Sequence, residues 1–233
     1  MLMVWDLSPS LNIPSHNSPA SPSSDKAFTS RPQPTAYVIT FPHPLSSVCG
    51  HPSTSKEFLV ADTRGSIFLT DWRSDPEQHS WRNSSVIELV EPRALADAVC
   101  GLQTRWSGSV AWRRDSVDII GAAYGSKFAL WDLSKLQGGK PAITGSTFPE
   151  GGTKFRWSPT YSEYFAVTTN CPAKGAVIHV YNASYIQAQP TVFNIAPRPL
   201  YVRDFDFIAE RGIPRIVAAV GREIITFYIG VES

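Results

Sequence analysis

The chain has 233 residues, a formal net charge of +1 and a charged fraction of 18%. A chain of this length can bury a sizeable core as one all-β domain, and its nearly balanced charge supplies no global field that attracts nucleic acid or an anionic membrane surface. The three cysteines cannot complete a disulfide framework, and no stretch approaches the ~18 consecutive apolar residues of a membrane span. We therefore expect a nuclear or cytoplasmic protein without membrane insertion.

The beginning of the chain has two parts. Residues 1–7 form a short apolar segment that includes Val4-Trp5-Asp6-Leu7 and predicts a β-strand. Residues 8–34 are dense in Ser and Pro with little that forms a core, so we expect them to be disordered. Their three Ser-Pro dipeptides suit proline-directed kinases, although an inert insertion explains them equally well. Residues 35–233 are expected to hold the folded domain.

Beyond residue 35, three kinds of short strand recur in a fixed order, which we name a, b and c. The a strands are expected at residues 47–52, 110–113, 155–159 and 205–207. The b strands are expected at 58–62, 119–123, 164–168 and 216–220. The c strands are expected at 66–72, 127–132, 177–182 and 224–228. The b strands are continuously apolar, small or β-branched, which is typical of strands buried on both faces.

Two further features recur in phase with these strands. A glycine precedes each c strand, where a tight hairpin needs a residue that tolerates positive φ: Gly65, Gly125, Gly175 and Gly221. An aromatic residue closes each c strand, including the one at the start of the chain: Trp5, Trp72, Trp131, Tyr181 and Tyr228. A fourth, outer strand is expected at residues 37–41, 85–90 and 191–195, and more weakly at 143–148.

Four antiparallel strands per unit, repeated with an aromatic at the end of the third, predict a β-propeller with insertions, since a blade usually spans ~40 to 45 residues. The alternative is a β-sandwich built from short strands. The repeated glycine and aromatic positions weigh against it, because a sandwich has no reason to repeat them. We therefore predict an all-β propeller.

The segments Val4-Trp5-Asp6-Leu7 and Leu130-Trp131-Asp132-Leu133 contain the WD dipeptide, and the chain resembles the WD40-repeat family. No unit carries that family's Gly-His dipeptide before strand a. Counting complete and partial units gives about four blades. Because WD40 rings commonly have seven, the resemblance implies that roughly three blades are missing before residue 1. Residues 1–7 would then be the third strand of a truncated blade. The last blade stops after its c strand at Ile229, and in similar propellers the same chain's N-terminus supplies the missing strand.

Motifs for catalysis are absent from the sequence. It contains no G-x-S-x-G elbow, no complete phosphate-binding loop and no G-x-G-x-x-G. The carboxylates Asp115, Asp118, Asp204 and Asp206 have no evident acid or base partner at motif level. We therefore predict a protein that is not an enzyme, with no cofactor, no catalytic residue and no small-molecule substrate.

A metal site and a nucleic-acid site are also disfavoured. His43, Cys49 and His51, with His16, match no zinc spacing, and His51-Pro52 is more simply a turn that ends strand a. Trp112-Arg113-Arg114 alternates indole and guanidinium as a stacking platform would. However, Trp112 has the same phase as Trp157 and Phe207, which predicts a core residue of strand a.

A closer resemblance is carried by residues 110–133 and by the stretch that runs from 155–159 through Tyr164, Asn182 and Pro197 to Asp204-Phe205-Asp206-Phe207. These are similar to the C-terminal half of fungal WD-repeat nucleoporins, the small propeller subunits of the Y-shaped outer-ring complex of the nuclear pore. The resemblance implies a non-enzymatic scaffold at the nuclear envelope that binds larger nucleoporins. The alternative is a WD40 subunit of a chromatin or transcription complex with an accessory nucleic-acid contact.

The sequence offers three loop-borne aromatic residues as candidate anchors for a protein partner: Trp81, Trp106 and Tyr201. Each of them fits a packing role at the end of a blade at least as well. A competing kind of propeller binds a ligand in its central channel, which requires charged or metal-binding residues that converge at one channel mouth. The sequence shows no such residues in phase across the blades.

Overall fold

The computed structural model describes residues 1–6, 35–71, 86–89, 108–136, 139–210 and 212–230. The chain divides into two compact units, residues 1–42 and 43–233. Apart from two short 3-10 turns, η2 (Leu133–Lys135) and η3 (Ala183–Tyr185), every regular element in the described residues is a β-strand. The prediction of an all-β protein is confirmed.

The first unit contains a two-stranded antiparallel sheet. Strand β1 (Leu2–Asp6) pairs with β2 (Thr35–Ile39), so that Leu2 lies opposite Ile39 and Trp5 lies opposite Ala36. The strand expected over residues 1–7 is therefore present, and the one expected over residues 37–41 begins two residues earlier. The side chain of Trp5 is largely exposed. The expected disordered segment, residues 8–34, lies outside the described residues.

The second unit contains four antiparallel sheets, numbered here in chain order. Sheet one consists of β3 (Leu45–Gly50), β4 (Glu57–Asp62), β5 (Ile67–Asp71) and β6 (Val86–Leu89). Sheet two consists of β7 (Ser109–Trp112), β8 (Ile119–Tyr124), β9 (Lys127–Asp132) and β10 (Ile143–Ser146). Sheet three consists of β11 (Lys154–Trp157), β12 (Tyr164–Thr168), β13 (Ala176–Asn182) and β14 (Thr191–Ala196). Sheet four consists of β15 (Val202–Phe207), β16 (Arg215–Val220) and β17 (Glu223–Tyr228).

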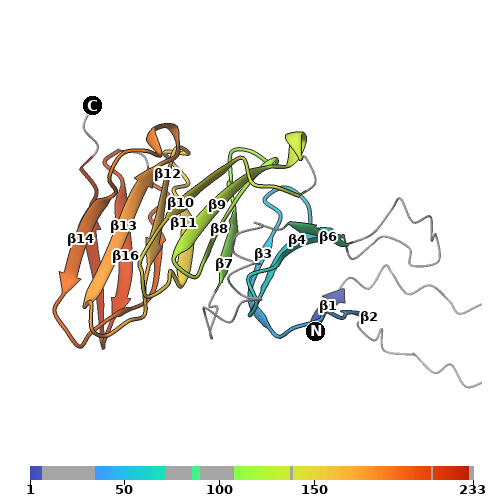
Figure 1. Ribbon diagram of the computed structural model, residues 1–233, viewed down its shortest axis with the longest axis horizontal. Helices are drawn as coiled ribbons and strands as arrows, with labels where there is room; N and C mark the ends of the chain where they lie inside the picture. The colour runs from blue at the N-terminus through green and yellow to red at the C-terminus, as the bar shows by residue number, and fades with distance from the viewer. Residues whose placement is uncertain (7–34, 72–85, 90–107, 137–138, 211, 231–233) are drawn as a thin grey trace, which may run out of the picture. The chain divides into compact units, whose positions relative to one another are not determined.

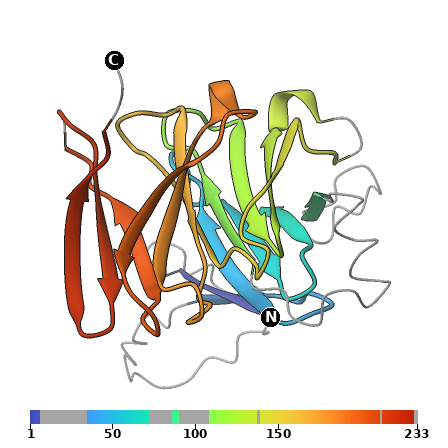
Figure 2. The same ribbon diagram turned by 60° about the vertical axis from the view of Figure 1, so that its left-hand side comes forward.

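The four sheets are arranged around a shared axis. Their first strands contact one another in the order β3, β7, β11 and β15, and each sheet runs outward from its first strand as a meander. Figure 1 shows the sheets following one another side by side, and Figure 2 shows the same succession from another direction. This is a four-bladed β-propeller arrangement. A sandwich would instead stack the strands in two facing layers, so that alternative is excluded.

Three apolar clusters fill the spaces between successive sheets. The middle strands β4, β8 and β12 are buried along most of their length on both faces, as their apolar composition predicts. Between sheets two and three the fit depends on Gly121, because a Cβ atom there would lie 2.3 Å from Cζ of Phe155. Packing of the sheets against one another therefore accounts for the largely buried middle strands.

The four glycines predicted to precede the third strands all have a positive φ. Their φ values are 85° at Gly65, 49° at Gly125, 86° at Gly175 and 61° at Gly221. An L-residue with a side chain rarely adopts such angles, which explains why glycine recurs at this point of each sheet.

The aromatic positions are partly displaced from their predicted places. Trp131 lies opposite Ile120, Tyr181 opposite Phe165 and Phe227 opposite Ile216. The equivalent of Trp131 in sheet four is therefore Phe227 and not Tyr228, which is 57% exposed. The reason is the two-residue turn at Gly221, which pairs Val220 with Glu223 and so fixes the phase of β17. In sheet one the equivalent residue is Thr70, opposite Phe58, and Trp72 lies outside the described residues.

Candidate protein-binding surfaces

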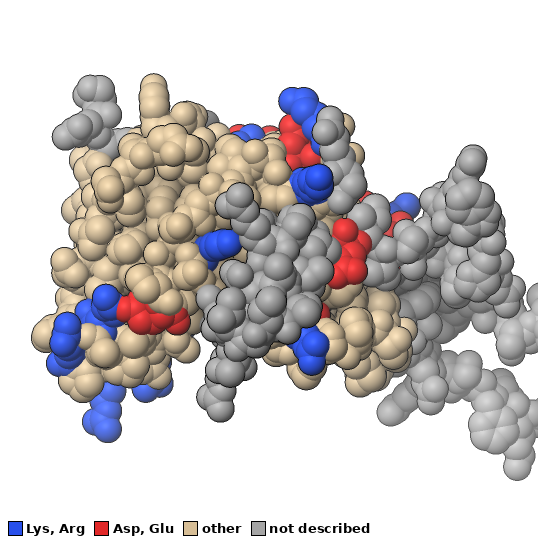
Figure 3. Space-filling model, viewed as in Figure 1, with Lys and Arg blue, Asp and Glu red and all other residues tan. Residues whose placement is uncertain are grey.

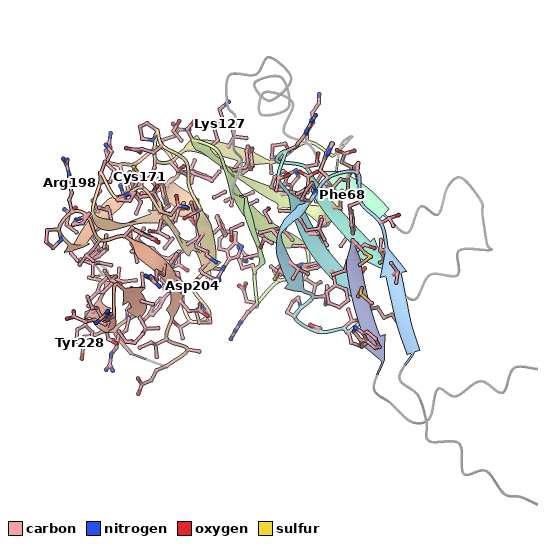
Figure 4. All side chains as sticks on the ribbon, turned by 90° about the horizontal axis from the view of Figure 1, so that it is seen from below. Phe68, Lys127, Cys171, Arg198, Asp204 and Tyr228 are labelled. Atoms are coloured by element: carbon pink, nitrogen blue, oxygen red, sulfur yellow. The ribbon has the colours of Figure 1, made fainter. Side chains whose placement is uncertain are left out.

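The outer face of sheet four is the first candidate surface. In the described residues, β17 is bonded only to β16, whereas the third strands β5, β9 and β13 are bonded on both sides. The side chains of Ile224 and Tyr228 on β17 are 71% and 57% exposed. Figure 4 shows Tyr228 of sheet four at the opposite end of the second unit from Phe68 of sheet one. An unpaired strand edge beside exposed apolar side chains is the combination to which another β-strand adds.

The two faces of β17 differ because its side chains alternate in direction. Ile225 and Phe227 are half-buried against the third apolar cluster, and the rings of Phe227 and Phe193 are 5.1 Å apart. Ile224 and Tyr228 belong to the opposite face, where the guanidinium of Arg215 lies 4.7 Å from the centre of the Tyr228 ring. In sheets one to three, the third strands bury most of their side chains. Within the described residues of the second unit, this face of sheet four is therefore exposed at Ile224 and Tyr228, unlike the third strands of the other sheets.

Charged side chains meet beside the first strands of sheets three and four. Nζ of Lys154 is 3.7 Å from Oδ2 of Asp204, and Nη2 of Arg156 is 3.2 Å from Oδ1 of the same carboxylate. Figure 4 shows Asp204 on the side of sheet four that faces the other sheets. Residues of all four first strands line an adjacent cavity of about 490 Å³. The sequence did not indicate this convergence, because it places cations on one strand and carboxylates on another.

At this axis, the contacts between sheets one and two are made by smaller polar groups. The backbone N–H of Val110 donates to Oγ of Ser47 at 3.4 Å, and that of Trp112 donates to Sγ of Cys49 at 3.4 Å. Burial raises the pKa of the Cys49 thiol, although the guanidinium groups of Arg156 and Arg114 act in the opposite direction. The thiol of Cys49 is therefore a packing group held in its neutral form.

A second candidate surface is a groove of about 640 Å³ between sheets two and three. It lies at the ends of the first strands β7 and β11, next to the turns that follow the third strands β9 and β13. Its walls include Arg113 and Trp157 at the ends of their a strands, Glu163 in the turn before β12, and Tyr185 in the turn η3. Tyr185 is 71% exposed. Tryptophan, tyrosine and arginine are the residues that most often supply binding energy at protein interfaces.

Among the candidate metal ligands, His51 has structural partners, and His16 lies outside the described residues. Nδ1 of His51 accepts hydrogen bonds from the backbone N–H groups of Ser53 and Thr54, and its Nε2 is 3.6 Å from Oε2 of Glu57. The edge of the His51 ring meets Trp112 at a centroid distance of 4.5 Å. Among the described residues, no group of three or more His, Cys, Asp or Glu side chains is placed to hold a metal ion.

Trp112 and Arg113 of the candidate nucleic-acid motif also make contacts within the protein. Trp112 is 5% exposed, and its Nε1 donates to the carbonyl of Val117 at 2.7 Å. Arg113 is turned toward the neighbouring sheet, with its guanidinium 5.8 Å from the centre of the Trp157 ring. The prediction that Trp112 is a core residue in phase with Trp157 and Phe207 is confirmed, since all three pair with the same position of the following strand.

Of the three predicted partner anchors, only Tyr201 lies in the described residues, half-buried directly before β15. Trp81 and Trp106 fall outside them. Two of the residues that line the groove, Trp157 and Tyr185, were not predicted from the sequence as anchors for a partner. The signal that could have revealed them is the alignment of the turn Asn182-Ala183-Ser184-Tyr185 with Asp132-Leu133-Ser134-Lys135, which places an aromatic where the preceding blade has a lysine.

The surface of the second unit has few charges in the view of Figure 3, where most of the area over β13 and β14 is free of acidic and basic side chains.

Comparison of the sequence with known protein families finds no match, and a search of curated proteins finds none either. Within the part of the chain that is described, no helix is long and apolar enough to cross a lipid bilayer. The architecture and its surfaces are therefore the basis for a functional assignment.

Proposed function

We propose that this protein is a non-enzymatic scaffold of the WD40 type whose function is to bind other proteins. The observation that carries this proposal is the outer face of sheet four, where β17 has a partner strand on one side only within the described residues and the side chains of Ile224 and Tyr228 are exposed. Burial of such a face against a partner removes apolar surface from water and satisfies the free backbone groups of the edge at the same time. A rigid arrangement of sheets suits this role, because its binding faces need little ordering on association.

The finer assignment we propose is a structural subunit of the outer-ring complex of the nuclear pore, with larger nucleoporins as partners and the nuclear envelope as location. Its support is the resemblance of residues 110–133, of 155–159 and of Asp204-Phe205-Asp206-Phe207 to fungal WD-repeat nucleoporins. The low charged fraction of 18% agrees with recognition through apolar and hydrogen-bonding surfaces rather than through a charged field.

Affinity purification of the tagged chain from fungal cells, followed by mass spectrometry, tests both levels. Recovery of outer-ring nucleoporins supports the finer assignment. Recovery of a chromatin or transcription complex overturns that assignment and leaves the scaffold role in place. Absence of any reproducible protein partner overturns the scaffold role itself.

A pair of variants tests whether the captured partner binds to sheet four. Ile224→Asp places a charge on the open face and should abolish capture of the partner. Val192→Asp is the matched control, because Val192 is also an exposed aliphatic residue, 48% exposed, on an outer strand, β14. Equal capture by the two variants would show that another surface carries the interaction.

A further inference from the structure

Trp157, which lines both the groove between sheets two and three and the axial cavity, has a buried hydrogen-bond donor for which the described residues supply no acceptor. Trp157 is 6% exposed, and its Nε1 has no hydrogen-bond partner among the described residues. The other two tryptophans buried in the described sheets are both satisfied: Nε1 of Trp112 donates to Val117, and Nε1 of Trp131 donates to the carbonyl of Gly139 at 3.0 Å. A buried polar group that lacks a partner costs free energy, so it marks a place where an acceptor would be bound favourably.

Comparison with sheet two shows that the missing bond is specific to this position. Trp112 and Trp157 occupy the same register, and each is followed by a turn of the same length before the next strand. In sheet two the turn carbonyl five residues on accepts the indole N–H. In sheet three the corresponding residue, Ser162, does not accept it, although Ser162 and Glu163 both line the groove. The internal acceptor that the fold provides in one blade is thus lacking in the next.

Among the described residues, one carboxylate that lines the groove, that of Glu163, has no ion-pair partner. Nε of Arg113 lies 2.8 Å from Oδ1 of Asp115, an ion pair too bent to count as a hydrogen bond. The Asp132 carboxylate lies 3.3 Å from Nζ of Lys135, and the hydroxyl of Ser134 holds the pKa of Asp132 below its usual value. For Glu163, no ion pair is found within the described residues. The groove therefore offers a negative charge to an incoming group.

We propose that this groove binds a short extended segment of a protein partner that carries an arginine or lysine side chain. A backbone carbonyl of the segment accepts the Nε1 hydrogen bond of Trp157, the cationic side chain pairs with Glu163, and its aliphatic stem packs on the exposed ring of Tyr185. A phosphate group or an acidic peptide would be repelled by the Glu163 carboxylate. The one cationic side chain among the described residues that line the groove, Arg113, is already paired with Asp115. The site lies on a different surface from sheet four, so either can fail without the other.

Titration with a defined peptide, followed by nuclear magnetic resonance of the indole N–H groups, tests the proposal on the full chain. The probe is the acetylated, amidated pentapeptide Ala-Leu-Arg-Leu-Ala, and its controls replace the arginine with citrulline or glutamate. The resonance of Trp157 is assigned by its absence from Trp157→Phe. We expect the arginine peptide to move this resonance downfield and both control peptides to bind at least about tenfold more weakly.

Variants of the groove separate binding from folding. Glu163→Gln should weaken binding of the arginine peptide about tenfold, and Tyr185→Ala should weaken it further, while Glu210→Gln, a carboxylate paired with Arg215 elsewhere, leaves it unchanged. Trp157→Phe should lower the urea midpoint less than Trp112→Phe, because both remove the same ring volume but only the second removes a hydrogen bond. A Trp157 resonance that does not respond to the arginine peptide, or equal binding of the glutamate peptide, would overturn the proposal.

Discussion

Arg156 and Asp204 connect the first strands of sheets three and four, with Nη2 of the arginine 3.2 Å from Oδ1 of the aspartate. The same arginine also donates from Nη1 to the carbonyl of Phe155 at 3.0 Å, which holds its side chain along β11. Between sheets one and two, the corresponding contacts are a hydroxyl and a thiol that accept backbone N–H groups. The axial contacts between sheets one and two therefore differ in chemistry from those between sheets three and four.

Asp204→Asn should lower the free energy of unfolding by no more than about 1 kcal/mol, because the carboxylate is 55% exposed and water screens its attraction to Arg156 and Lys154. Urea unfolding at low ionic strength and in 1 M salt measures the effect. The difference between the variant and the parent chain should nearly vanish in high salt. A loss above about 2 kcal/mol that is independent of salt would mean that Asp204 acts as a buried structural group instead.

Gly121→Ala should lower the free energy of unfolding by about 2 to 3 kcal/mol, since the added methyl group would lie 2.3 Å from Cζ of Phe155 and 3.1 Å from a methyl carbon of Leu130. Thermal unfolding followed by circular dichroism gives the comparison. Gly230→Ala is the control, because no atom lies within 4 Å of the added carbon there. If Phe155→Leu in the Gly121→Ala background restores no stability, the ring of Phe155 is not the cause.

Stability should fall as the pH is lowered through the titration range of His179. Burial, and secondarily the charge of Lys174, lower the pKa of His179 from its ordinary value of 6.5. The unfolded chain then binds the proton more readily than the folded one. The contribution of the neutral imidazole is complete above pH 6.5 and is lost as the pH falls from 6.5 toward the folded pKa.

Urea unfolding between pH 7.5 and pH 5 measures this slope. His179→Phe removes the titrating group and retains an aromatic ring against Phe148, whose ring stacks on His179 at a centroid distance of 3.9 Å. The variant should lose less stability than the parent chain over this range. An identical pH dependence in both proteins would assign the effect to other groups.

Cys49 should react slowly with iodoacetamide at pH 7.5, because burial raises the pKa of its thiol and the thiolate is the reacting form. Mass spectrometry after timed alkylation compares it with Cys171, which is also half-buried. Cys49 is expected to be modified several-fold more slowly than Cys171. Faster modification of Cys49 would show that the axial cavity is open enough to hydrate the thiol.

The strand order of the second unit follows from its local sequence. Apolar segments such as 119–123 and 164–168 specify b strands, and Gly125 and Gly221 specify two-residue turns, because both depend only on neighbouring residues. The repeated phase of these signals indicated a propeller. The phase of the closing aromatic in sheet four was predicted one residue too late, since register depends on how the turn pairs two strands.

The chemistry of the sequence by itself thus determined the all-β class, the meander within each sheet and the buried role of Trp112. Tertiary structure alone decided which charges meet at the axis, which indole is left without an acceptor and which sheet face stays open. These properties depend on distances between residues of different blades, such as Arg156 and Asp204, which are 48 positions apart in the chain. Such distances arise from the packing of whole sheets, and no local sequence pattern encodes them.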